Sequence, residues 1–293
     1  MKVSRDRLYF NTSGYVLLTV LAGACLLPFL LIVAGSVSDE TAIYTDGYRL
    51  IPRQFSLKSY GIIFRAPASI LRAYAVTLML TAAGTALGLF LTAMTAFALQ
   101  TGDCKYRNVL AFYMYFTMLF NGGLTPFYIL MVRGLHLKNT YWAMLLPSLL
   151  SVWFILLTRN YMKSIPREVY ESAKIDGAGY FAMFLRITMP LSVPVLATIG
   201  LFIALGYWND WYYPMLFVED SRLYPMQFFL YRLLNAARFS EAVMKGANVA
   251  TANMPKEGMK MAMAVVATGP IIFLYPFIQR FFIRGLMIGA VKG

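Results

Sequence analysis

Long apolar runs separated by short polar segments make up most of this chain. Six of the runs approach or exceed the length of about 20 residues that an α-helix needs to cross the hydrocarbon core of a bilayer. They predict an all-α, polytopic membrane protein with six transmembrane helices. The expected spans are approximately 14–37, 70–99, 109–132, 141–158, 190–217 and 261–282.

The first run resembles a secretory signal peptide, because Lys2, Arg5 and Arg7 precede it. It is too long for the apolar core of such a peptide and carries Pro28 near its middle, so we interpret it as an uncleaved span. Residues 1–13 then form an N-terminal segment, and 14–293 form a single transmembrane domain.

Six spans place both termini on the same side of the membrane. The basic residues divide equally between the two sides, but long loops count for little in the positive-inside rule. The short clusters at Lys2–Arg7 and Lys105–Arg107 therefore favour cytoplasmic N- and C-termini. This orientation predicts long outer loops at 38–69 and 218–260 and a cytoplasmic segment at 164–189.

Composition supports a membrane location. Hydrophobic residues make up 59% of the chain and charged residues 13%, whereas soluble domains carry about 25% charged residues. The net charge of +13 does not predict nucleic-acid binding, because the basic residues form short clusters between apolar runs. The lipid bilayer is thus the expected environment and nucleic acid is not an expected partner.

The sequence offers no chemistry of its own for catalysis or for energy supply. It has neither a GxxxxGK[ST] phosphate-binding loop nor a GxSxG motif, and it contains one histidine and two isolated cysteines. The acidic pairs Asp39–Glu40 and Glu219–Asp220 are interpreted as solvated loop charge. We therefore predict no enzyme activity, no metal and no cofactor in this chain, so any energy for uphill transport must come from a partner.

One polar stretch, 168–194, interrupts the apolar pattern between the fourth and fifth spans. Pro166 suits a first helical turn, Glu168 faces the positive helix end, and Gly177 suits a left-handed helix terminus. Arg167 and Glu171 are spaced to form an ion pair. The pattern predicts a short amphipathic helix, then a bend, then a second helical run to Met189.

This helix has two interpretations. It could lie on lipid headgroups, or it could dock in a groove of another protein. Its apolar face, formed by Val169, Tyr170 and Ala173, is small, and acidic residues flank it. Anionic lipid would repel those acids, which favours docking over lipid.

Aromatic and amide side chains gather near the outer half of the fifth span. Rings stack on sugar faces while amides and carboxylates bind hydroxyls, but Trp and Tyr also form belts at any membrane interface. In the third span, Asn121-Gly122-Gly123 predicts a helix interruption that could line a cavity or allow close packing. The predicted substrate-pathway residues are Asn121, Tyr207, Trp208, Asn209, Asp210 and Trp211.

The spacing of the polar stretch is similar to the cytoplasmic motif of permease subunits in binding-protein-dependent ABC importers. That motif is E-A-A, three residues, G, nine residues, I-x-L-P, and this chain has Glu171-Ser172-Ala173, Gly177 and Ile187-Thr188-Met189-Pro190 at the same spacing. Ser172 and Met189 are the departures. The resemblance assigns ATPase coupling to Arg167, Glu168, Glu171, Ser172, Ala173, Asp176, Gly177, Ile187 and Pro190.

The run FNGGLTPFYILMVRGLHLKNTYWAMLLP at 120–147, with WNDW at 208–211 and TANMPKEGMKMA at 251–262, resembles the maltose-permease-like branch of carbohydrate importers. The nearest likeness is to the subgroup for complex or acidic polysaccharides, such as alginate oligosaccharides. The resemblance implies the type I permease fold in the bacterial inner membrane and alternating access driven by ATP.

The implied partners are a second, different permease subunit, two ATP-binding subunits that hold ATP and Mg²⁺, an extracytoplasmic solute-binding protein and an oligosaccharide. The segment 235–260 resembles a loop that probes the binding protein's sugar cleft. A basic outer surface favours an anionic ligand or an acidic docking face on a partner. The competing hypothesis is a stand-alone secondary carrier or channel for a polar solute, which would transport without an ATPase.

Overall fold

The computed structural model describes residues 5–65, 67–246 and 257–270, and in these ranges the chain is helical apart from its connecting segments. An isolated bridge joins Ser38 and Phe55, and no strand occurs among the described residues. The predicted all-α class is therefore confirmed. The chain divides into two units, one of Met1–Pro67 with Arg232–Ile271 and one of Ala68–Tyr231 with Ile272–Gly293.

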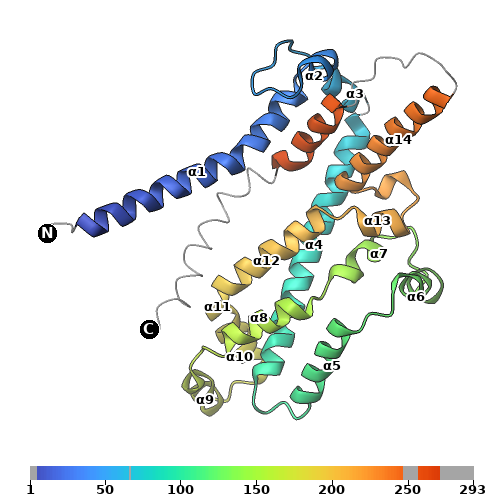
Figure 1. The fold of residues 1–293 in the computed structure, drawn as a ribbon. Helices are drawn as coiled ribbons and strands as arrows, with labels where there is room; N and C mark the ends of the chain where they lie inside the picture. The colour runs from blue at the N-terminus through green and yellow to red at the C-terminus, as the bar shows by residue number, and fades with distance from the viewer. Residues whose placement is uncertain (1–4, 66, 247–256, 271–293) are drawn as a thin grey trace. The chain divides into compact units, whose positions relative to one another are not determined.

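The helices vary widely in length, and several are short pieces separated by bends (Figure 1). The α-helices are α1 (Arg5–Ser36), α2 (Glu40–Asp46), α3 (Lys58–Ile63), α4 (Pro67–Gln100), α5 (Arg107–Leu119), α6 (Leu124–Ile129), α7 (Tyr141–Leu145), α8 (Val152–Met162), α9 (Arg167–Ile175), α10 (Tyr180–Met183), α11 (Met189–Leu191), α12 (Val193–Trp208), α13 (Tyr212–Phe217), α14 (Met226–Gly246) and a helix at 257–270. Two π-helical turns, η1 (Leu130–Gly134) and η3 (Phe184–Thr188), and two 3₁₀ turns, η2 (Leu146–Ser148) and η4 (Ser221–Leu223), complete the order.

Two helices of the described chain, α1 and α4, are long and apolar enough by themselves to cross a membrane. The number rises to five if each of three bent helix pairs forms one span. The predicted sixth span, 261–282, begins within the helix at 257–270 and otherwise lies outside the described residues. The segments 38–69 and 218–260, which were predicted to be outer loops, contain helices of their own that the hydropathy pattern does not reveal.

The predicted interruption of the third span at Asn121–Gly123 is confirmed. Helix α5 ends at Leu119, α6 begins at Leu124, and the two are bent by 112°. The Asn121 side-chain oxygen accepts the Gly123 N–H at 2.8 Å. Gly123 has a φ of 89°, a left-handed conformation that favours glycine.

The fifth span departs from the predicted range 190–217 at both ends. Pro190 lies within α11, and an 84° bend at Ser192 precedes α12. Pro194 explains this bend, because a proline ring clashes with the carbonyl four residues earlier and the residue has no N–H to donate. At the other end, α12 stops at Trp208 and α13 starts at Tyr212, so residues 209–211 break the span. The fourth span is also bent, by 49° between η2 and α8.

In the first unit, Glu40 caps the helix at 257–270. Its two carboxylate oxygens accept the N–H groups of Glu257 at 2.9 Å and Gly258 at 3.0 Å. Asp39 likewise accepts the Thr41 N–H and caps α2. The interpretation of this acidic pair as solvated loop charge was therefore wrong, because both carboxylates satisfy N–H groups that a helix start leaves without partners.

The change Glu40→Gln is expected to destabilise the helix at 257–270 by about 1 kcal/mol, since it removes the charge that opposes the positive helix end. Hydrogen exchange at the Glu257 and Gly258 amides should become faster. Glu219→Gln is the matched control, because Glu219 pairs with Lys138 on the surface. Equal exchange in both variants would contradict the cap.

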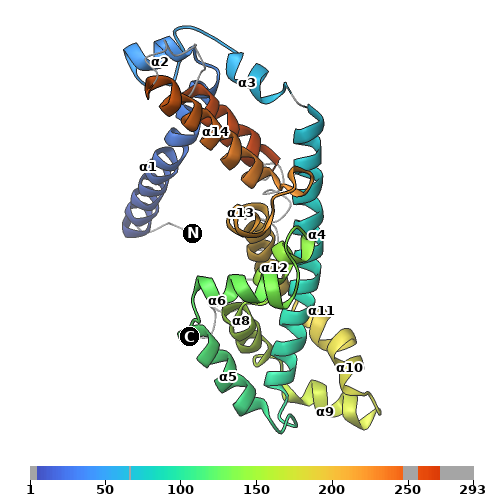
Figure 2. The ribbon, with the colours of Figure 1, turned by 90° about the vertical axis from the view of Figure 1, so that its right-hand side faces the viewer.

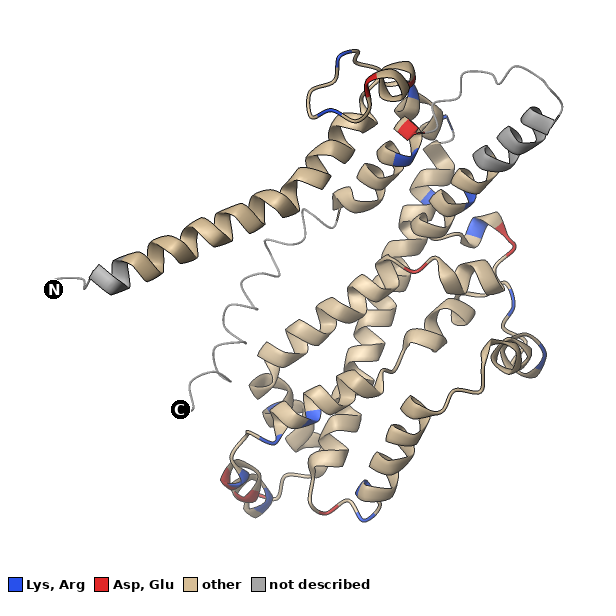
Figure 3. Cartoon of the chain, in the orientation of Figure 1, with Lys and Arg blue, Asp and Glu red and all other residues tan. Residues whose placement is uncertain are grey.

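In the second unit, glycines bring α4 close to α12 and to the segment after η2. A Cβ at Gly84 would lie 2.3–2.6 Å from the Tyr207 ring, and a Cβ at Gly88 would lie 2.9 Å from the Leu149 carbonyl oxygen. Small residues at such spacing are typical of close helix packing in membranes. Charged side chains are concentrated at helix ends and connections, and the long helices are largely free of them (Figure 3).

Candidate functional site

Helix α9 occupies the position predicted for the coupling helix. It begins one residue after Pro166, which is its N-cap rather than its first helical residue. Glu168 lies in its first turn and Lys174 in its last, so both charges complement the helix dipole. The helix, the start of α10 and the loop between α4 and α5 lie at one end of the second unit (Figures 1 and 2).

The end of α9 is a Schellman motif centred on Gly177. The Gly177 N–H donates to the Lys174 carbonyl at 3.0 Å, and the Ala178 N–H donates to the Ala173 carbonyl at 2.9 Å. Gly177 has a φ of 80°, as this motif requires. The predicted left-handed helix end is therefore confirmed.

The small apolar face of α9 packs on core residues of the second unit near the end of α4. Ala173 is buried and Tyr170 is half-buried. The Tyr170 ring lies 6.2 Å from that of Phe97 on α4, and its hydroxyl is 3.2 Å from that of Thr188. The outer face of α9 is exposed and includes Glu168 and Glu171.

The other motif residues divide between exposed and packed positions. Arg167, Ser172, Asp176 and Pro190 are exposed, whereas Ile187 packs against the core. The predicted ion pair between Arg167 and Glu171 is not formed, although both residues are described. Lys174 pairs instead with Asp103, a partner in a loop distant in sequence.

Asp103 is a residue that sequence reasoning missed. It lies in the loop between α4 and α5 and accepts hydrogen bonds from Lys174 and from the Tyr180 hydroxyl, the latter at 2.5 Å. The Lys174 ammonium, and then the Tyr180 hydroxyl, hold the pKa of Asp103 below its ordinary value. No periodicity signals a contact between residues so far apart in the chain.

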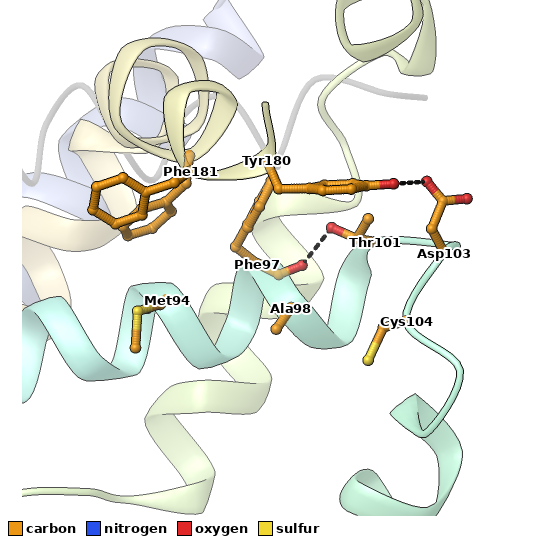
Figure 4. A pocket seen from close by; sticks show the side chains of 9 residues that line it. Met94, Phe97, Ala98, Thr101, Asp103, Cys104, Tyr180 and Phe181 are labelled. Atoms are coloured by element: carbon orange, nitrogen blue, oxygen red, sulfur yellow. Dashed lines mark hydrogen bonds between the residues drawn. The ribbon is translucent and has the colours of Figure 1, made fainter. Parts of the chain in front are cut away.

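Two cavities flank this cluster. The more polar one, of about 420 Å³, is lined by Arg107, Arg167, Glu171 and Lys174, among others. The apolar one, of about 380 Å³, is lined by α4 residues, Cys104 and the rings of Phe181 and Phe184. Figure 4 shows the Tyr180 ring reaching from α10 across the top of the apolar cavity to Asp103.

The predicted substrate residues do not form one continuous group. Tyr207 and Trp208 are buried, and the Tyr207 hydroxyl donates to the Leu145 carbonyl at 2.7 Å. Asn209 accepts from the Gln227 amide at 3.3 Å, and Trp211 stacks on Tyr231 with ring centroids 4.8 Å apart.

The Asp210 carboxylate accepts the N–H groups of Tyr212 and Tyr213, the first two residues of α13, at 3.0 and 3.2 Å. This places the two tyrosines on the wall of a cavity of about 570 Å³ that also includes Asn121. The cavity thus lies between the break in the third span and the start of α13. Tyr213 was missed by sequence reasoning, although its place beside the aromatic cluster was a signal for it.

Within the described part of the chain, His, Cys, Asp and Glu residues form no group of three or more able to hold a metal. The arrangement instead offers a short helix with an exposed outer face at one end of the second unit, and a cavity lined by an amide and aromatic rings.

Comparison with known proteins agrees with this arrangement. The chain is 38% identical over 284 residues to "Protein LplC" of Bacillus subtilis (strain 168), covering 97% of this chain and 95% of the relative. It is 36% identical over 284 residues to the "Polygalacturonan/rhamnogalacturonan transport system permease protein YtcP" of the same strain, covering 97% and 98%.

A solved structure is also similar. It is titled "Crystal structure of a bacterial ABC transporter involved in the import of the acidic polysaccharide alginate", and one of its chains matches with a TM-score of 0.79 and 28% identity, covering 96% of this chain and 99% of that one. The family described as "Binding-protein-dependent transport system inner membrane component" matches residues 84–288, which include α9 and the three bent helix pairs. This chain is therefore a member of the binding-protein-dependent transport system inner membrane components, the membrane-embedded permeases of ABC importers.

Proposed function

We propose that this chain is the permease subunit of an importer for acidic oligosaccharides in the bacterial inner membrane. The likeness to the alginate importer chain over 96% of the sequence carries this proposal. The relative named for polygalacturonan transport supports it, because galacturonan and alginate are both chains of uronic acids. The alternative of a stand-alone carrier or channel is not favoured, since the family is dependent on binding proteins.

In this function, α9 docks in a cleft of an ATP-binding subunit. Its Pro166 start, its Gly177 end and its packing on Phe97 make it short and rigid, while its acidic outer face stays exposed. Two ATP-binding subunits hold ATP and Mg²⁺, and this chain supplies no catalytic group. Their closure moves α9, and the permease alternates between inward- and outward-open states.

The second permease subunit and the solute-binding protein complete the complex. We assign both termini and α9 to the cytoplasm and six spans to the chain, from the charge clusters and the apolar runs of the sequence. The segment 38–69, nearly all of which belongs to the first unit, then lies outside. There, Arg49 and Arg53 share the single carboxylate of Asp46 at 3.8 and 3.0 Å, which leaves positive charge for an anionic ligand or an acidic partner face.

The cavity of about 570 Å³ is the proposed part of the sugar path in this chain. Its volume is in the range of about 300–1,000 Å³ that is typical of small-molecule sites. The Asn121 amide can bind hydroxyls, and the rings of Tyr212 and Tyr213 can stack on sugar faces. Of the remaining predicted residues, Asn209 and Trp211 are exposed and so are open to a ligand.

A matched pair of sugars tests the substrate class. Proteoliposomes holding the complete importer, with its own binding protein, should hydrolyse ATP faster when a tetrasaccharide of uronic acids is added. The control is the same tetrasaccharide after reduction of each carboxylate to a primary alcohol, which keeps length and linkage. We expect the reduced sugar to stimulate ATP hydrolysis about tenfold less, because the positively charged groups of the importer that bind the sugar lose their carboxylate partners. Equal stimulation would overturn the acidic class.

A further inference from the structure

The Asp103–Lys174–Tyr180 cluster, here called the loop clamp, joins three elements of the second unit. Asp103 belongs to the loop that follows α4, Lys174 to the last turn of α9, and Tyr180 to the first residue of α10. The carboxylate accepts from both partners, and the Lys174 ammonium also lies 5.4 Å from the centre of the Tyr180 ring. All three pairwise contacts of the cluster are therefore made.

The clamp lies where other packing is sparse. The cavities of about 420 and 380 Å³ lie on its two sides, and both are lined by Asp103, Tyr180 and Phe97. Beneath it, Phe97 contacts the rings of Tyr170 and Phe184, with centroids 6.2 and 5.6 Å apart. One aromatic cluster and one polar cluster therefore hold α9 and α10 to the end of α4.

The clamp's exposure separates its role from that of the aromatic cluster. The side chains of Lys174 and Asp103 are 44% and 53% exposed, and exposed ion pairs contribute little to stability. Hydrogen bonds between charged groups are nevertheless short and directional. An interaction of this kind fixes the direction in which two elements lie without greatly stabilising the fold.

We propose that Asp103 is a positioning residue that, through Lys174 and Tyr180, makes α4 follow the movement of α9. The inference rests on the proposed function of α9 as the ATPase-docking helix. Without the clamp, α9 can still dock and ATP can still be hydrolysed, but the long α4 helix lags behind. Transport is then lost relative to hydrolysis, while assembly is retained.

The experiment compares neutral substitutions of two lysines in the purified complete importer. Lys174→Gln breaks the clamp. Lys105→Gln is the matched control, because Lys105 lies in the same loop as Asp103 and over a tyrosine ring at 5.6 Å but has no ion pair in the described structure. We expect the number of sugars imported per ATP to fall about fivefold in Lys174→Gln, at the lower end of the range for allosteric couplings. The number should stay unchanged in Lys105→Gln.

Charge exchange provides the decisive comparison. Asp103→Lys alone should lower the import-to-hydrolysis ratio, and Asp103→Lys combined with Lys174→Asp should restore most of it. Tyr180→Phe, which keeps the ring and loses the hydroxyl, should give an intermediate loss. An unchanged ratio in Asp103→Lys, or no restoration in the double variant, would overturn the clamp.

These outcomes are distinct from failure of the proposed function. If the unmodified chain does not co-purify with an ATP-binding subunit, or imports no sugar, the proposed function itself is wrong. If the unmodified complex works and every clamp variant keeps its import-to-hydrolysis ratio, only the positioning role of Asp103 is wrong.

Discussion

Sugar uptake is expected to fall about tenfold or more when Gly177 is replaced by valine, since a left-handed backbone costs an ordinary residue about 1–2 kcal/mol. Nothing lies within 4 Å of a Cβ built at Gly177, so the effect comes from its φ of 80° and not from a clash. The strain weakens the two hydrogen bonds that close the Schellman motif. It therefore changes the direction of the chain between α9 and α10.

Gly179 provides the matched control for this change. It is also exposed, and a Cβ there also meets nothing within 4 Å, but its φ of −70° and ψ of 160° suit any residue. Gly179→Val should therefore keep uptake, while Gly177→Asn should restore part of it because asparagine tolerates the left-handed region. Uptake and ATPase stimulation measured in proteoliposomes decide the matter. Normal values for both in Gly177→Val would rule out α9 as a rigid coupling element.

A second large effect is expected at Gly84, where alanine should lower the stability of the chain by about 1–3 kcal/mol through overpacking. The new methyl group would meet the Tyr207 ring at 2.3–2.6 Å. That ring cannot easily move, because it is buried and its hydroxyl is bonded to the Leu145 carbonyl. Displacing it would cost about a further 1 kcal/mol in hydrogen bonding.

Gly206→Ala is the control, since Gly206 lies beside Tyr207 on α12 and a Cβ there has open space. Thermal unfolding of the purified chain in detergent should show a lower midpoint temperature for Gly84→Ala and an unchanged midpoint for Gly206→Ala. Combining Gly84→Ala with Tyr207→Leu should cost less than the sum of the two changes, as expected for side chains in contact. Additive effects would show that contact with the Tyr207 ring is not the cause of the destabilisation by Gly84→Ala.

Local signals in the sequence predict much of this structure. Gly177 and the helix before it were predicted from spacing and capping chemistry, and the break at Asn121–Gly123 from an asparagine followed by two glycines. These features depend on a few neighbouring residues. The apolar runs likewise predict where most helices lie, because a membrane span needs both length and low polarity.

Contacts between distant segments were not predictable in this way. Lys174 has several acidic residues near it in sequence, yet its partner is Asp103. Glu40 resembles an ordinary loop acid until the start of the helix at 257–270 is placed beside it. The fifth span was predicted to begin at Pro190, whereas the 84° bend lies at Ser192. Two prolines lie close together there, and only the fold shows which one breaks the helix.

The 84° bend at Ser192 has a mechanical consequence for the permease. The segment α10–α11 and helix α12 meet almost at a right angle. A force applied along the axis of α10–α11 therefore has almost no component along the axis of α12. Such a force tilts α12 about the bend and does not move it along its own axis. A sideways tilt separates neighbouring helices at one membrane face and closes them at the other.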